Sequence, residues 1–117
     1  MDNRATLSDL KKEVDNFIIE RDWKQFHNPQ DLAVSIAIES AELLEIFQWG
    51  IKKELSLDKI EKVKEELADI LIYSLSLANV SGLDVSTIIR DKIKKNAIKY
   101  PVEKVRGKAK KYTEYNK

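Results

Sequence analysis

Cysteine and long apolar runs are both absent from this chain of 117 residues. Without a thiol, a disulfide framework, a thiolate nucleophile and a cysteine-bound metal cluster are all excluded. No apolar stretch approaches the ~18 residues that a membrane-spanning helix needs, and the polar N-terminus lacks the pattern of a signal peptide. We therefore expect a cytoplasmic protein with no membrane partner.

Histidine occurs once, as His27. A di-iron carboxylate bundle uses a Glu-x-x-His pair on each of two helices, so one histidine is too few. No glycine-flanked serine suggests the nucleophile elbow of a Ser-His-Asp enzyme, and no glycine-rich loop suggests a phosphate-binding loop. These three kinds of catalytic site are therefore not expected.

Glycine (3 residues) and proline (2 residues) are rare, so long stretches of the chain are free to be helical. The apolar periodicity predicts an all-α fold, a four-helix bundle in a single domain over residues 1–117, with a basic and irregular C-terminal tail. The first predicted helix begins at the Thr6 cap and ends near residues 22–23, and the second runs from Asn28-Pro29 to about Gln48. The third predicted helix runs from residue 57 or 58 to residue 79, and the fourth runs from the Asp84 cap to Tyr100.

The net charge of +1 conceals a strong segregation of charge along the chain. Residues 90–117 hold 11 Lys and Arg against 3 Asp and Glu, whereas residues 1–89 hold 10 against 17. A basic end of this kind has three interpretations: it is simply solvated, it neutralises an acidic surface in an oligomer, or it contacts phosphate or nucleic acid. Charge alone leaves these alternatives open.

The second predicted helix carries an acidic pair in an unusual place. On a helical wheel, Glu39 falls within the most apolar sector, between Leu32 and Ile46, and Glu42 lies on the same side three residues later. Neighbouring carboxylates repel each other unless a cation or a proton lies between them. The pair therefore faces either solvent at a gap in the packing or a compensating partner.

The third predicted helix repeats this pattern, with Glu66, Asp69 and Tyr73 along one stripe. The segment 70–78 that follows is apolar nearly all round, which predicts burial in a bundle or an oligomer interface. Two facing acidic pairs would supply up to four carboxylates to a hard cation such as magnesium, with manganese as a substitute. The alternative is that these acids lie on solvated faces and pair with nearby lysines.

Several sequence blocks, in order, resemble those of the MazG-like all-α nucleotide pyrophosphohydrolases, and most closely the dCTP pyrophosphatase branch. The resemblance covers nearly the whole chain. It rests on Arg21-Asp22-Trp23-Lys24-Gln25-Phe26-His27, on Glu39-x-x-Glu42 through Phe47-Gln48-Trp49, on Glu65-Glu66-Leu67-Ala68-Asp69-Ile70-Leu71-Ile72-Tyr73, on Asp91-Lys92 with Asn96 and Tyr100-Pro101, and on Lys111-Tyr112-Thr113-Glu114.

The resemblance implies magnesium-dependent hydrolysis of a nucleoside triphosphate to a monophosphate and pyrophosphate. In that reading the enzyme removes unwanted dCTP, or a modified dCTP, from the nucleotide pool. It also implies that Glu39, Glu42, Glu66 and Asp69 bind the metal ion, and we expect Glu39 to act in addition as the catalytic base. Lys92 and Asn96, one helical turn apart, are then expected to contact the phosphate chain.

Trp23, Trp49 and Tyr73 are the remaining candidates for substrate binding. Both tryptophans lie at expected helix ends, where a flat ring can stack on a nucleobase or simply pack in an interface. Tyr73 follows Asp69 by one turn and is placed to hydrogen-bond a phosphate or a sugar. Val14 stands where dCTP-preferring relatives carry a histidine, so the base preference is open.

The apolar third helix would leave a large exposed patch on a monomer, so we expect a homodimer or a homotetramer, as the resemblance also implies. The alternative function is a noncatalytic helical interaction module whose basic end binds nucleic acid or an acidic partner. Nucleic acid is the less expected partner, because two acidic pairs on core-facing stripes would repel phosphates.

Overall fold

The computed structural model describes residues 1–49, 55–109 and 113, and α-helix dominates them. Within these residues the elements are α1 (Leu7–Glu20), a 3₁₀ turn η1 (Lys24–Phe26), α2 (Pro29–Glu45), α3 (Leu57–Ser81), α4 (Val85–Lys99) and α5 (Val102–Val105). The predicted all-α class is confirmed, and no strand occurs in the described part of the chain.

The helix starts follow from local capping. The Thr6 hydroxyl accepts from the Asp9 backbone N–H at 3.0 Å, and the Thr6 N–H donates to the Asp9 carboxylate at 3.1 Å, which completes a capping box. The Asn28 side chain likewise accepts from the Asp31 N–H at 2.9 Å, with Pro29 in the first turn of α2. These bonds satisfy backbone donors that a helix N-terminus leaves open, so the starts were visible in the sequence.

The helix ends agree less well with the predictions. α3 stops at Gly82, whose φ of 65° is the left-handed conformation that glycine adopts readily. α2 ends at Glu45 instead of near Gln48, because residues 46–48 form tighter turn hydrogen bonds to residues three positions earlier. The tail predicted to be irregular contains the short helix α5.

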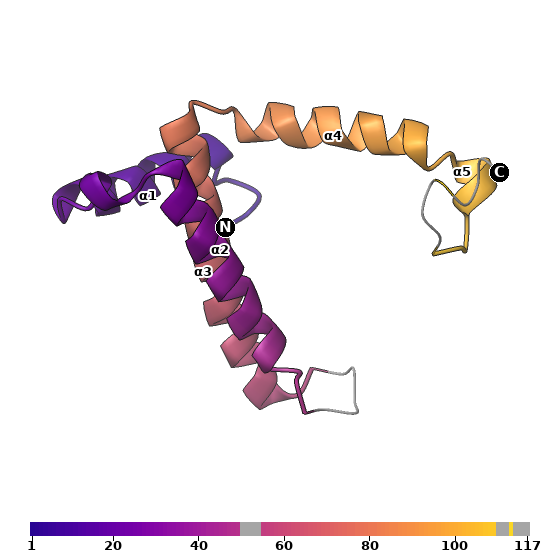
Figure 1. Cartoon of the computed structure of the whole chain (residues 1–117), viewed down its shortest axis with the longest axis horizontal. Helices are drawn as coiled ribbons and strands as arrows, with labels where there is room; N and C mark the ends of the chain where they lie inside the picture. Colours follow the sequence, from indigo (N-terminus) through magenta and orange to yellow (C-terminus); the bar gives the residue numbers. More distant parts are fainter. Residues whose placement is uncertain (50–54, 110–112, 114–117) are drawn as a thin grey trace. The chain divides into compact units, whose positions relative to one another are not determined.

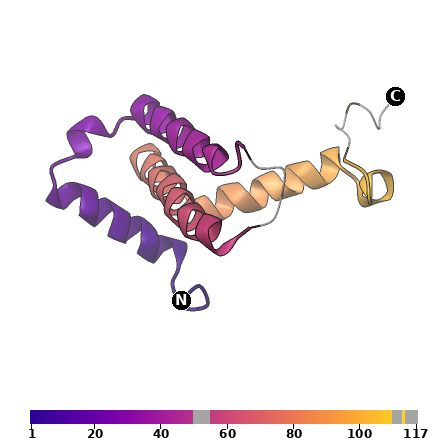
Figure 2. The ribbon, with the colours of Figure 1, turned by 90° about the horizontal axis from the view of Figure 1, so that it is seen from below.

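The chain divides into two units, residues 1–83 and 84–117, each described by itself. In the first unit α2 and α3 run antiparallel side by side, and α1 lies against α3 (Figures 1 and 2). Its core contains Ile18, Leu32 and Ala78. The Asn79 side chain also donates to the Lys11 carbonyl at 3.0 Å, which fixes α1 to the C-terminal part of α3.

The second unit contains α4 and α5. Asp84 caps α4 by accepting from the Thr87 N–H at 3.1 Å. No single helix among the described residues is long and apolar enough to cross a membrane. The sequence of α3 together with α4 has the length and the apolar composition of a membrane-crossing segment.

Candidate active site

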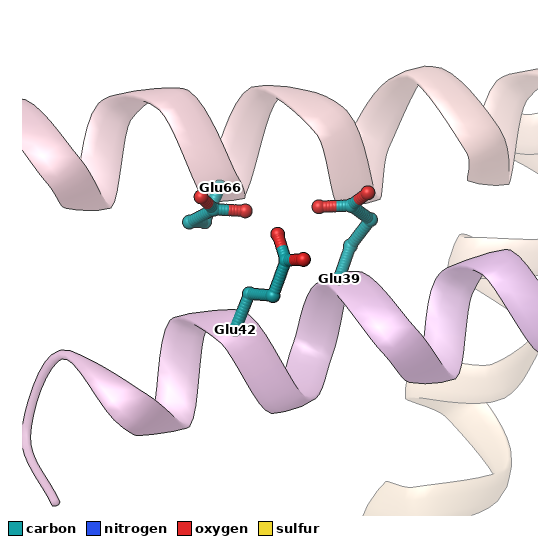
Figure 3. Close-up of side chains that lie close together, drawn as sticks. All are labelled: Glu39, Glu42 and Glu66. Atoms are coloured by element: carbon teal, nitrogen blue, oxygen red, sulfur yellow. The ribbon is translucent and has the colours of Figure 1, made fainter.

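Three glutamates converge between α2 and α3. Glu39 and Glu42 extend from α2, and Glu66 extends toward them from α3 (Figure 3). One carboxylate oxygen from each lies within 4.8 Å of the other two. Two acidic residues three positions apart on α2 share one side of the helix, so packing α2 against α3 is enough to bring all three together.

The cluster is partly withdrawn from water. Glu39 and Glu66 are half-buried and Glu42 is exposed. The Oε2 atoms of Glu39 and Glu66 are buried and have no hydrogen-bond partner among the described residues. A buried carboxylate oxygen without a donor is costly, so this arrangement favours a ligand that offers positive charge.

Proximity of the carboxylates and burial shift the protonation of the cluster. Protonated Glu66 can donate to the carboxylates of Glu42 and then Glu39, and this, followed by burial and charge repulsion, raises the pKa of Glu66 to about 7. Burial is the largest cause that raises the pKa of Glu39, and repulsion from Glu42 and Asp69 adds to it. The cluster therefore resists holding all its negative charges at once, and a proton or a cation between the carboxylates relieves the repulsion.

Asp69 lies beyond the close cluster of three. Its charge still raises the pKa of Glu39, so it lies within electrostatic reach of the cluster. Asp69 also lines a cavity of about 180 Å³ on the α1 side of α3, together with Phe17, Ile18, Trp23, His27, Ile72, Tyr73 and Ser76. This aspartate therefore connects the carboxylates to the cavity.

Aromatic rings form much of the cavity wall. Trp23 meets the edge of Phe17 at 5.8 Å between ring centroids and an interplanar angle of 74°. The Arg21 guanidinium lies 3.7 Å from the centre of the Phe17 ring. The His27 and Tyr73 rings lie 6.5 Å apart and are tilted by 41° to each other. Such a wall offers aromatic surface to a ring-shaped ligand.

A second cavity, of about 330 Å³, opens beside the carboxylates and is lined by Glu42, Glu45, Ile46, Lys62 and Glu66. Glu66 and Glu42 thus have space next to them in which a large polar group can lie. Lys62 places a positive charge in that wall, one turn before Glu66 on α3. The neighbouring Glu61 instead pairs with Lys64 at 2.9 Å, the solvated arrangement weighed as an alternative for these acids.

The other predicted site residues are more scattered. Trp49 is 90% exposed and is the last residue described before the gap at 50–54. Lys92 and Asn96 lie one turn apart on α4, in the second unit. The structure thus brings Trp23 and Tyr73 together with Asp69 around one cavity, whereas it leaves the roles of Trp49, Lys92 and Asn96 as predictions.

Sequence reasoning did not assign several residues that line the two cavities to a site, Phe17, Lys62 and Ser76 among them. A signal for Ser76 existed, because residues 66, 69, 73 and 76 follow one stripe of α3.

Comparisons with known proteins identify the family. The model of the MazG-like family matches residues 34–115. The chain belongs to the MazG-like family. The relationship predicted from the sequence blocks is thereby confirmed.

Several relatives carry the name of an enzyme. dCTP pyrophosphatase 1 of Bos taurus is 39% identical over 117 residues, and the match covers 96% of this chain and 69% of the relative. dCTP pyrophosphatase 1 of Homo sapiens is 36% identical over 114 residues, and the match covers 93% of this chain and 67% of the relative. A pyrophosphatase from Archaeoglobus fulgidus superposes with a TM-score of 0.73 at 41% identity, covering 80% of this chain and 91% of that one. The iMazG protein of Vibrio superposes with a TM-score of 0.53 at 26% identity, and the match covers 83% of this chain and 99% of that one.

The pKa of Glu66 makes the stability of the metal-free protein depend on pH. Its value of about 7 exceeds the usual 4.5, so the folded state binds this proton more tightly than the unfolded chain does. The stabilising contribution is complete below about pH 4.5 and is lost as the pH rises through about 7. Glu66→Gln imitates the protonated side chain, so the melting temperature in chelator should exceed that of the wild type at pH 8 and approach it near pH 5.

Glu65→Gln is the matched control, since it removes one charge from the exposed adjacent position on the same helix. Its melting temperature should keep the same offset from the wild type at both pH values. An equal offset for Glu66→Gln would contradict the raised pKa.

Proposed function

We propose that this protein hydrolyses dCTP or a modified dCTP to the monophosphate and pyrophosphate, using magnesium, and so removes such nucleotides from the pool. Family membership supports the prediction that the chain is a nucleoside triphosphate pyrophosphohydrolase. The observation that carries the proposal is the juxtaposition of three converging carboxylates with an aromatic-walled cavity. A nucleotide has the two parts that these features would accept.

The carboxylates suit magnesium, with manganese as the substitute. Glu39, Glu42 and Glu66 would hold the ion and Asp69 would complete the set, since hard cations prefer carboxylate oxygens. The unpartnered Oε2 atoms of Glu39 and Glu66 fit this role. When bound, the ion would neutralise phosphate charge and orient the phosphate chain for displacement.

Glu39 is our candidate for the catalytic base. It is the half-buried member of the α2 pair, and the carboxylate oxygen that does not hold the ion would accept the proton from water. Orienting and deprotonating this water would let its oxygen attack a phosphorus atom while pyrophosphate leaves.

Five further residues are assigned to the substrate. We assign Trp23 and Tyr73 to the cavity beside Asp69. Trp49, which does not line that cavity, keeps its predicted role of stacking on the base and marks a second candidate position for the base. Lys92 and Asn96, on one face of α4, are assigned to the phosphate chain. In this proposal residues 1–117 act as one domain in the cytoplasm.

A panel of deoxy- and ribonucleoside triphosphates, including 5-methyl-dCTP, tests the reaction directly. We expect pyrophosphate release with magnesium, a monophosphate as the other product, and no release in excess chelator. Glu66→Gln should abolish turnover, because it removes an anionic ligand, whereas Glu65→Gln should retain it. A well-folded protein that hydrolyses nothing on the panel would instead favour the helical interaction module.

Trp49→Ala tests whether this ring contacts the base. Because Trp49 is 90% exposed, its loss should leave the melting temperature unchanged. Stacking contributes about 1–3 kcal/mol per base, so KM should rise roughly tenfold with a smaller change in kcat. Trp49→Phe, which keeps a flat ring, should recover most of the affinity. Identical steady-state kinetics for wild type and Trp49→Ala would remove this residue from the site.

We also propose a homodimer or homotetramer. On α2, Val34 and Ile38 lie one helical turn apart and are 51% and 53% exposed. Leu71 is 53% exposed on α3. Apolar side chains that follow two adjacent helices in this way are typical of a surface covered by another copy of the chain.

Ile38→Glu should therefore shift the protein to a smaller species in light scattering coupled to size exclusion. The charge would have to be buried in the interface, which is unfavourable. Gln30→Glu adds the same charge to a polar position of α2 and should leave the assembly intact. A wild-type protein that elutes as a monomer at all concentrations would overturn the assignment.

A further inference from the structure

The cavity beside Asp69 contains a polar side chain for which the reaction described above has no role. Ser76 lines this cavity and is only 2% exposed, which makes it the buried polar residue of the described chain. Its Oγ atom has no hydrogen-bond partner among the described residues. Buried hydroxyl groups are normally hydrogen-bonded, so this one calls for a physical reason.

Two other helical serines show what Ser76 does not do. Ser40 and Ser74 each donate to the backbone carbonyl four residues earlier, both at 2.7 Å. This local bond is available to a serine within a helix. Ser76 is two residues from Ser74 on α3, yet its hydroxyl does not make the equivalent bond. The hydroxyl is therefore left available at the cavity wall.

The cavity suits part of a nucleotide. Its volume of about 180 Å³ is below the about 300–1,000 Å³ typical of sites for whole small molecules, so it accommodates a ring rather than a complete nucleotide. Phe17, Trp23 and Tyr73 offer aromatic surface, and no lysine or arginine among the described residues lines the cavity to hold a phosphate. The base is the part of the substrate that fits.

A second unpartnered atom lies in the same wall. The Nδ1 atom of His27 is buried and has no hydrogen-bond partner among the residues described. His27 and Ser76 thus provide two polar atoms in an otherwise largely apolar enclosure. A few polar groups within an apolar pocket are what fixes the orientation of a ligand.

We propose that Ser76 is a specificity-determining residue whose Oγ hydrogen-bonds the polar edge of the substrate's base. This inference rests on the proposed function and adds the group that reads the base. A site that hydrogen-bonds a substrate discriminates strongly against a ring that cannot complete the bond, because the buried hydroxyl then stays unpaired.

Ser76→Ala and its matched control Ser74→Ala separate a base-reading role from a structural one. For each protein, kcat/KM is measured with dCTP, dTTP, dUTP and dATP in magnesium. We expect Ser76→Ala to lower the ratio between the best and the worst substrate at least tenfold, mainly through KM. Its melting temperature should equal or exceed that of the wild type. Ser74→Ala should keep the wild-type ratio.

Binding without turnover distinguishes failure of this inference from failure of the proposed reaction. Calorimetry with dCMP and dUMP in excess chelator should show that the wild type prefers one of them and that Ser76→Ala loses the preference, even if no triphosphate is hydrolysed. An unchanged substrate ratio in Ser76→Ala overturns the inference. Failure of Ser76→Ala to fold also overturns the inference. A wild-type protein that hydrolyses no triphosphate and binds neither monophosphate overturns it as well.

Discussion

Repulsion between the carboxylates of α2 and α3 is the constraint on which the rest of the site depends. Separated helices would place Glu39 and Glu66 in water, where their charges are screened. Packing α2 along α3 brings their oxygens within 4.8 Å and removes water from two of them. Apolar burial, as of Leu32 on α2, thus offsets the electrostatic cost and holds the carboxylates together.

Helical periodicity links the carboxylates to the cavity. Residues 66, 69, 73 and 76 are spaced by three or four along α3, so one stripe carries a carboxylate of the cluster at one end and a buried hydroxyl at the other. Asp69 belongs to both neighbourhoods, because it acts on the pKa of Glu39 and lines the cavity. One helix therefore sets the separation between the carboxylate cluster and the cavity.

Much of the fold and of the acidic cluster could be predicted from the sequence because the determining signals are local. Thr6, Asn28 and Asp84 satisfy backbone donors within three residues, and the wheel position of Glu39 follows from its own helix. The orientation of a hydroxyl is different. Ser74 and Ser76 are the same residue on the same helix, and only the neighbouring helix and loop decide which of them bonds to its own backbone. Likewise, the short helix α5 and the early end of α2 depend on surroundings that periodicity does not encode.

The distribution of unsatisfied polar atoms gives the strongest physical argument that these features form one site. Four buried side-chain atoms of the described residues lack a hydrogen-bond partner: His27 Nδ1, Glu39 Oε2, Glu66 Oε2 and Ser76 Oγ. Two belong to the carboxylate cluster, and the other two line the cavity that Asp69 connects to it. Each such atom reduces the free energy of unfolding, and a sequence selected only for stability would replace them with apolar groups. Their concentration in adjoining places therefore supports one site built from the carboxylate cluster and the cavity.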